Sequence, residues 1–235
     1  MIMDFSGKHV VVTGGSGALG TAVVGSLIGM GAICTVPYVH EAEAERFPYR
    51  DNANVTLMGV SDLADEGMVE KVYAGVAPLW ASIHIAGGFA PGTVAGTDQH
   101  ALMGQLESNL VSCFLCCRAA VNAMLAAGGG GRIVNVASRQ ALEPRSGAGM
   151  TAYTIAKGGV ATLTVALAEE VAKDGILVNA VAPSIMDTAA NRQAMPKADF
   201  DAWPKVEEVA ATIVFLASPG NRVTRGAVVP VYGKF

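Results

Sequence analysis

Short runs of β-branched and apolar residues alternate along the chain with longer segments whose apolar positions recur every three or four residues. The short runs have the length of buried strands, and the longer segments have the period of helices. The runs lie at residues 9–13, 31–38, 54–60, 80–85, 132–138, 175–181 and 227–231. Strands that alternate with helices predict parallel pairing. We therefore expect one α/β domain over residues 1–235, a doubly wound sheet of about seven parallel strands with helices on both faces.

Composition narrows the class of protein. Of 235 residues, 51% are apolar and 15% are charged, and the net charge is −4 without a basic run. A dedicated nucleic-acid binder is therefore not expected. No stretch of membrane-spanning length lacks Gly, Pro or charge, and no signal-peptide core is visible, which predicts a cytoplasmic protein that does not bind membranes. The four cysteines are expected to pack in the core and not to bind metal; they are Cys34, Cys113, Cys116 and Cys117.

A glycine-rich turn joins the first strand to the first helical segment. Its Gly15-x-Gly17-x-x-Gly20 pattern is either a plain tight turn or a dinucleotide fingerprint, and the order strand, turn, helix favours the fingerprint. Glycines let the backbone approach a pyrophosphate, whose charge the helix N-terminus stabilises. The sequence thus predicts a Rossmann-type domain. The expected cofactor contacts in the turn are Gly14, Ser16, Gly17, Ala18, Leu19 and Gly20.

The carboxyl ends of the following strands are expected to face the adenosine half of that cofactor. The candidate contacts are Tyr38, Asp62, Leu63, Ala86 and Gly87. A carboxylate at the end of the second strand would favour NAD, but Tyr38 stands there, and no nearby Arg favours NADP. Glu41 is a displaced candidate for the ribose, so NAD and NADP both stay open. His84 ends the fourth strand and is expected to be a hydrogen-bonded structural residue, not a catalytic one.

The segment Tyr153-Thr-Ile-Ala-Lys157 places a phenol and an ammonium on one face of a predicted helix. Such a pair is either an exposed amphipathic pair or a proton-transfer site. A cation beside the phenol is expected to lower its pKa from about 10, which makes tyrosine a usable general acid or base. Ser138 ends the fifth strand and is expected at the same sheet edge as the glycine turn. Gly158 and Gly159 are expected to let the helix pack closely on the sheet.

Two further segments bear on the site. From Asp98 to about Ala127 the pattern predicts one long helix, and Asn109 inside it requires a partner or solvent for its polar side chain. Residues 184–205, after the sixth strand, are predicted to form a short substrate-side lid. Apolar residues of the lid, with Phe89 across the cleft, indicate a small or medium, partly apolar substrate. The lid residues concerned are Ile185, Met186, Met195, Phe200 and Trp203.

Together these motifs resemble the classical short-chain dehydrogenase/reductase family over essentially the whole chain. The matching pieces are Thr13-Gly14…Gly20, Asp62, Ala86-Gly87, Asn109, Ser138, Tyr153-x-x-x-Lys157, Asn179-Ala-Val-Ala-Pro183 and Thr188. Ala18 stands where the family has glycine, and His84-Ile85 stands where it has Asn-Asn. The second difference leaves open how the central strand is braced.

The resemblance implies roles for four residues. Tyr153 would donate or accept the proton at the substrate oxygen, and Ser138 would hydrogen-bond that oxygen. Lys157 would hold the nicotinamide ribose and lower the tyrosine pKa, while Asn109 would anchor a water beside Lys157. The implied reaction is the reversible interconversion of a ketone or aldehyde and an alcohol, with hydride transfer to or from NAD or NADP.

The resemblance also implies how the rest of the cofactor and the assembly are held. Pro183, the Ile185 backbone and Thr188 would contact the nicotinamide. A homodimer or homotetramer is expected, with the helices of Asn109 and Tyr153 as contact surfaces. Two alternatives remain: a non-catalytic cofactor-binding sensor or scaffold, and an isomerase or dehydratase akin to extended relatives of the family.

Overall fold

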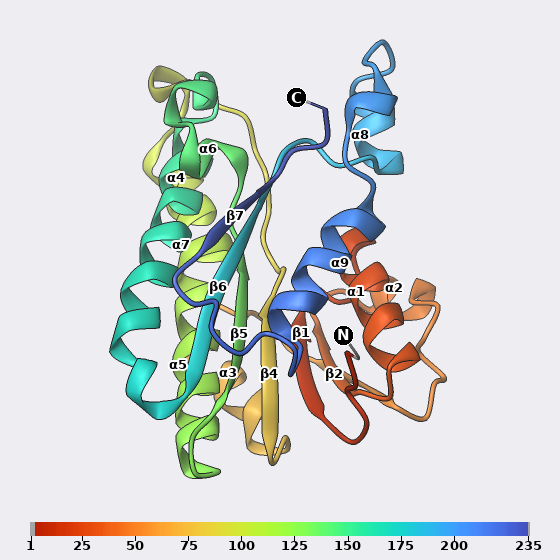
Figure 1. The fold of residues 1–235 in the computed structure, drawn as a ribbon. Helices are drawn as coiled ribbons and strands as arrows, with labels where there is room; N and C mark the ends of the chain where they lie inside the picture. The colour runs from red at the N-terminus through yellow and green to blue at the C-terminus, as the bar shows by residue number, and fades with distance from the viewer. Residues whose placement is uncertain (1–2, 235) are drawn as a thin grey trace.

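The fold is built on one seven-stranded parallel sheet with the strand order β3-β2-β1-β4-β5-β6-β7 (Figure 1). The structure is a computed structural model that describes residues 3–234. The strands are β1 His9–Thr13, β2 Ile33–Tyr38, β3 Val55–Gly59, β4 Leu79–His84, β5 Gly131–Val136, β6 Ile176–Pro183 and β7 Val228–Val231. The predicted doubly wound α/β domain is confirmed, with strand ends within two residues of the expected positions.

Helices follow the strands in alternation. The α-helices are α1 Ala18–Gly29, α2 Glu41–Arg46, α3 Glu66–Ala74, α4 Gln99–Leu106, α5 Ser112–Ala126, α6 Arg139–Leu142, α7 Thr151–Glu170, α8 Ala189–Ala194 and α9 Val206–Ala217. Short 3-10 turns lie at Val94–Gly96, Pro144–Gly147, Ala172–Asp174 and Phe200–Ala202. The short helices α2, α6 and α8 have too few residues to show a helical period, and the sequence pattern did not predict them.

Side chains alternate between the two faces of each strand, so neighbouring residues of β1 enter different cores. Val10 and Val12 pack with α1 and α9 on one face, and Val11 packs with α3, α5 and α7 on the other. Figure 1 shows the two helical layers on either side of the sheet. The chain order reverses between β1 and β4, which pair directly. A crevice is expected there, outside the carboxyl ends of the strands.

The long helix predicted from Asp98 to Ala127 is interrupted by a π-helical turn, Glu107–Val111. Asn109 lies in this turn, which joins α4 to α5 without a break. Turns of this type are frequent at functional sites because the extra residue re-aims the side chains. The whole helix, Gln99–Ala126, is long and apolar enough to cross a membrane by length and composition. Here α5 packs on β4 and α3, as a core helix does.

His84 braces the centre of the sheet. The sequence, with His84-Ile85 in place of Asn-Asn, had left this bracing open. Its Nδ1 lies 2.8 Å from Asn135 Oδ1, and Asn135 Nδ2 donates to Thr164 Oγ1 of α7 at 2.9 Å. A carboxamide oxygen only accepts, so Nδ1 of His84 carries a proton. Nε2 lies 2.8 Å from Ser82 Oγ. The expectation of a satisfied structural histidine is confirmed.

The four cysteines are buried, as predicted, but three side chains far apart in sequence meet. Ligand atoms of His84, Cys113 and Cys117 lie within 4.8 Å of one another. Histidines scattered along the sequence gave no sign of this cluster. The His84 nitrogen nearest Cys117 is Nδ1, 3.5 Å from Cys117 Sγ. Because this nitrogen carries the proton shared with Asn135, its lone pair does not face the sulfurs.

Candidate active site

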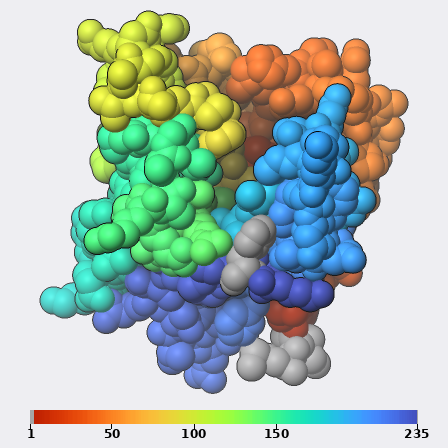
Figure 2. All heavy atoms as spheres, turned by 90° about the horizontal axis from the view of Figure 1, so that it is seen from above, coloured from red at the N-terminus to blue at the C-terminus, as the bar shows by residue number. Residues whose placement is uncertain are grey.

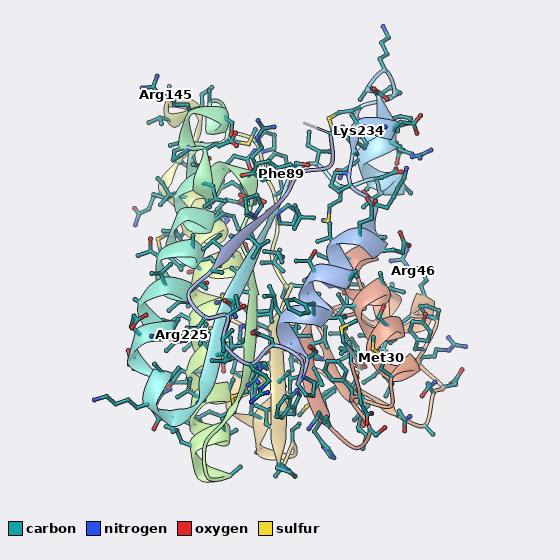
Figure 3. All side chains as sticks on the ribbon, viewed as in Figure 1. Met30, Arg46, Phe89, Arg145, Arg225 and Lys234 are labelled. Carbon is teal, nitrogen blue, oxygen red and sulfur yellow. The ribbon has the colours of Figure 1, made fainter. Side chains whose placement is uncertain are left out.

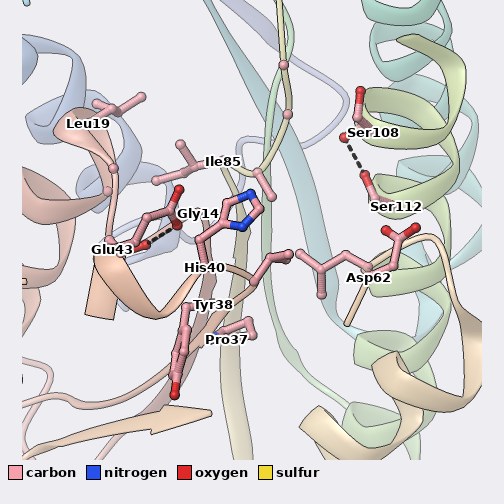
Figure 4. Close-up of a pocket in the computed structure, with 18 of the residues that line it drawn as sticks. Gly14, Leu19, Pro37, Tyr38, His40, Glu43, Asp62, Ile85, Ser108 and Ser112 are labelled. Carbon is pink, nitrogen blue, oxygen red and sulfur yellow. Dashed lines mark hydrogen bonds between the residues drawn. The ribbon is translucent and has the colours of Figure 1, made fainter. Parts of the chain in front are cut away.

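A cavity of about 470 Å³ lies over the glycine turn, at the crevice between β1 and β4 (Figure 4). It is lined by every residue that the sequence assigned to the pyrophosphate and adenosine contacts: Gly14, Ser16, Gly17, Ala18, Leu19, Gly20, Tyr38, Asp62, Leu63, Ala86 and Gly87. Further lining residues that sequence reasoning missed include His40, Glu43, Ser108 and Ser112. The two serines come from the π turn and α5, whose path the local pattern did not reveal.

Two glycines of the turn are required by close backbone contacts. Gly14 has φ +67°, and a Cβ there would lie 2.6 Å from Ala86 N. A Cβ on Gly20 would collide with the Gly14 carbonyl. Gly17 differs, because a Cβ there would meet only an ordinary 3.4 Å contact.

Gly17 instead caps α1 without a side chain. The first turn of α1 contains no acidic residue and no side chain caps it, and its residues Ala18, Leu19 and Gly20 line the cavity. Such a helix end is an anion site, and the cradle suits a pyrophosphate. The Ala18 that departs from the family's glycine is the first residue of α1.

A second cavity of about 190 Å³ continues the first. It is lined by the four predicted catalytic residues, Asn109, Ser138, Tyr153 and Lys157, and is called the catalytic cavity after that prediction. Leu19, Ile85, Gly87 and Gly88 line both cavities. The phenol and the ammonium therefore open onto the same crevice as the glycine cradle. Seen from above, the surface is hollowed between the segment around the start of α7 and the blue segment with α8 (Figure 2).

Helix α7 brings Tyr153 and Lys157 to this crevice one turn apart. Ala152, Ala156 and Val160 are buried on the face that packs toward the sheet. The glycine pair was expected to pack on the sheet, which is wrong. A Cβ on Gly159 would lie 2.7 Å from Leu110 Cδ2 of the π turn, while Gly158 has open space beside it.

The electrostatics of the pair differ from the sequence expectation. Burial raises the pKa of Tyr153, and the nearby Ser138 hydroxyl opposes this rise. Burial therefore outweighs any effect of Lys157, whose Nζ lies 6.0 Å from the Tyr153 ring centroid and donates to the Val136 carbonyl at 2.8 Å. Lys157 is itself only 6% exposed, and burial lowers its pKa to about 8 while Cys113 works in the opposite direction.

Two buried oxygens in the catalytic cavity lack partners among the described residues, Ser138 Oγ and Asn109 Oδ1. Asn109 Nδ2 donates to Gly88 O at 2.9 Å and to Gln105 O at 3.0 Å. Asn109 Oδ1 and Lys157 Nζ both approach Gly87, lying 2.5 and 3.4 Å from the place its Cβ would take. Unpaired buried oxygens are costly, so an arrangement that keeps them suits a ligand or an ordered water.

Another part of the wall of this cavity comes from the end of β6 and from residues after β6 and β4. Pro183, Ser184, Met186 and Phe89 line the cavity there. Figure 3 shows Phe89 between the end of the molecule that carries α6 and the segment with α8. The Phe89 ring is 59% exposed and meets the Tyr153 ring edge-on, with centroids 5.1 Å apart. An exposed apolar ring beside the phenol offers a surface for an apolar substrate.

The predicted lid, 184–205, contains α8 and a 3-10 turn. Asp187 anchors it by accepting from Arg192 Nε and Lys205 Nζ, both at 2.5 Å, and these bonds hold the pKa of Asp187 well below its usual range. Thr188 and Ile185 lie outside the two cavities. The Thr188 hydroxyl accepts from Asn191 N at 3.2 Å and so caps α8.

The remaining apolar lid residues are placed unequally. Met186 lines the catalytic cavity, whereas Trp203 is 4% exposed and packs with Phe200, their ring centroids 5.0 Å apart. Met195 and Phe200 are not among the residues lining either cavity. Position in the sequence alone did not distinguish Met186, which lines the cavity, from the lid residues that do not.

Comparisons with known proteins agree with this geometry. A family model described as short chain dehydrogenase matches residues 8–199. A cis-4-hydroxycyclohexanecarboxylate dehydrogenase from Sinomonas cyclohexanicum is 33% identical, with 98% of this chain and 97% of that protein covered. A galactitol 2-dehydrogenase from Rhizobium johnstonii is 31% identical, with 97% and 95% covered. A short-chain type dehydrogenase/reductase from Mycobacterium ulcerans has the same fold, with a TM-score of 0.88 at 22% identity over 98% of this chain and 90% of that one.

Proposed function

The chain belongs to the short-chain dehydrogenase family, and we propose that it is an NAD(P)-dependent oxidoreductase that interconverts a carbonyl compound and an alcohol. Relatives named as dehydrogenases, 31% and 33% identical over nearly the whole chain, support an oxidoreductase. The observation that carries the proposal is the continuity of the two cavities, because a cofactor lying in the glycine cradle would reach Tyr153 and Ser138 through it.

The residues present suit a dinucleotide. The uncovered N-terminus of α1 would hold the pyrophosphate, and Asp62 and Ala86 would contact the adenosine. Near the other end, Lys157 donates one hydrogen bond to Val136, and an ammonium has three donors, so two remain for ribose hydroxyls. When bound, the nicotinamide would supply or accept the hydride at the reacting carbon.

The chain's own residues manage the proton and the charge on the substrate oxygen. In the reducing direction negative charge develops on the carbonyl oxygen, which Ser138 Oγ–H would stabilise and to which Tyr153 would donate its proton. In the oxidising direction Tyr153 would accept that proton. Lys157 would hold the nicotinamide ribose with its free N–H donors, and Asn109 Oδ1 would hold a water beside the ammonium.

The substrate proposed is a small or medium carbonyl or alcohol with an apolar part. Phe89 and Met186 supply apolar walls, while the reacting end meets hydroxyl groups. The two relatives are named for galactitol and for cis-4-hydroxycyclohexanecarboxylate, both hydroxylated small molecules. Segment 184–205 is proposed to act as the substrate-side lid. A cytoplasmic location and a homodimer or homotetramer stay predictions.

Fluorescence titration with NADH and NADPH, followed by turnover on a panel of ketones and secondary alcohols, tests the proposal. Tyr153→Phe is expected to lower kcat by about 10²- to 10⁴-fold while cofactor binding persists, because only the proton-transfer group is removed. Tyr49→Phe is the matched control, since Tyr49 packs on Phe47 outside both cavities. Retained turnover in Tyr153→Phe would refute the assignment of the acid.

The same titration separates the alternatives. A sensor or scaffold would bind cofactor, turn over no carbonyl or alcohol, and be indifferent to Tyr153→Phe. An isomerase or dehydratase would bind cofactor tightly and convert substrate without net change in NADH absorbance. Net oxidation of NADH or NADPH that depends on a ketone supports the oxidoreductase against both.

A further inference from the structure

We infer that Glu43 makes this chain prefer NAD(H) to NADP(H), taking the place of the carboxylate that is missing from the end of β2. This inference rests on the proposed function, since it concerns the same cofactor cavity. The sequence made Glu41 the candidate acid for the ribose. In the structure Glu43, two residues further along α2, lines the cavity instead.

Glu41 is directed away from the cavity. The hydroxyl of Tyr38 donates to Glu41 Oε2 at 3.1 Å. Figure 4 shows the Tyr38 side chain pointing away from the space that Glu43 and His40 face. Glu41 is absent from the residues that line the cavity, whereas Glu43 is among them. The Glu41 carboxylate therefore accepts the Tyr38 hydroxyl outside the cavity and does not line the site.

Glu43 is held inside the cavity by the glycine turn itself. Ser16 Oγ donates to Glu43 Oε2 at 3.1 Å, across 27 residues of sequence. Ser16 follows Gly14 and Gly15 and lines the same cavity. The bond uses one carboxylate oxygen, and an ionised carboxylate has acceptor sites on both oxygens for ribose hydroxyls. The contact thus fixes an acceptor beside the phosphate cradle, where an adenosine ribose has to lie.

The geometry of α2 explains why two acids so close in sequence diverge. Helical residues two apart point roughly 200° apart around the axis, so Glu41 and Glu43 face opposite sides. The helix is anchored beneath by Ala44 and Phe47, which are 6% and 2% exposed. With these two residues in the core, α2 cannot rotate to exchange the acids.

The charge of the cavity disfavours a 2′-phosphate. Among its lining residues, all within the described part of the chain, none is Lys or Arg. The acidic side chains that line it are Glu43 and Asp62, and the one basic type is His40. A 2′-phosphate adds about two negative charges to the adenosine. Placing them beside Glu43 without a cation would be unfavourable, whereas a 2′-hydroxyl would donate to the carboxylate.

The experiment compares dissociation constants of NADH and NADPH by fluorescence titration of the full chain. The wild type is expected to bind NADH about 10- to 100-fold more tightly than NADPH. Glu43→Gln keeps an acceptor oxygen but removes the charge, so the ratio should fall to roughly threefold, mostly through tighter NADPH binding. Glu41→Gln is the matched control and should leave the ratio unchanged. Circular dichroism melts confirm that each variant is folded.

Three outcomes would overturn the inference. The wild type binds NADPH at least as tightly as NADH; Glu43→Gln leaves the ratio where the wild type has it; or Glu41→Gln changes the ratio as much as Glu43→Gln does. In each of these cases cofactor still binds, so the proposed oxidoreductase stands. If neither NADH nor NADPH binds the wild type, the proposed function fails and takes this inference with it.

Discussion

Replacement of the buried lysine in the catalytic cavity by methionine, Lys157→Met, is expected to stabilise the protein at neutral pH while abolishing turnover. Lys157 is 6% exposed, and burial lowers its pKa from an ordinary 10.5 to about 8. One pKa unit corresponds to about 1.4 kcal/mol, so keeping this side chain charged in the folded state costs about 3 kcal/mol. Its hydrogen bond to the Val136 carbonyl returns about 1 kcal/mol. The variant should therefore be about 2 kcal/mol more stable at pH 7.

The sign of the pH dependence follows from the direction of the shift. The folded-state pKa lies below the unfolded one, so between pH 8 and pH 10.5 the unfolded chain binds more protons at Lys157 than the folded chain. The contribution of Lys157 to wild-type stability consequently rises with pH across this window, because the buried side chain loses its charge. Most of the decrease in this free-energy cost, about 2 kcal/mol, occurs between pH 7 and pH 10. At pH 10 the variant and the wild type should be about equally stable.

Urea denaturation of both proteins at pH 7 and at pH 10 measures the effect. Other lysines, tyrosines and cysteines titrate in the same range, but they are common to both proteins and cancel in the difference. Lys173→Met, at an exposed position, is the control and should show the same stability difference from wild type at both pH values. The reasoning is refuted if the difference between Lys157→Met and wild type changes by less than about 0.5 kcal/mol between the two pH values.

Two further predictions test the cradle and the brace of the sheet. Gly20→Ala is expected to abolish NADH binding and to destabilise the fold by about 2 kcal/mol or more, since the methyl group collides with the Gly14 carbonyl. Gly17→Ala meets only an ordinary contact and should cost less, about 0.5 to 1 kcal/mol, because alanine is a poorer N-cap than glycine. Thermal melts and NADH titration check this, and equal melting temperatures for the two variants would contradict it. His84→Leu should cost about 2 kcal/mol in urea denaturation, because Asn135 Oδ1 loses its 2.8 Å donor in the core and keeps only the weaker Cys117 thiol at 3.5 Å. A loss under about 1 kcal/mol would show that His84 does not brace the sheet.

Much of the fold and of the candidate site could be predicted because the signals are local. Alternation and helical period predicted the seven strands and the long helices within a few residues. The order strand, glycine turn, helix predicted the cradle, and the spacing of Tyr153 and Lys157 predicted that both face one crevice. These rules depend on residues close together in the sequence, and backbone geometry converts them directly into a shared face or a turn.

The amino-acid sequence by itself thus determined the architecture and the glycine cradle, and it predicted which four residues would meet in one cavity. Only the tertiary structure decided that Glu43 and not Glu41 enters the cavity, that Thr188 caps α8, and that burial sets the pKa of Lys157. The physical reason is that the direction of a side chain on a short helix, and the depth at which a charge is buried, depend on neighbours distant in sequence. Ser16 bonding to Glu43 across 27 residues is such a neighbour, and no local pattern encodes it.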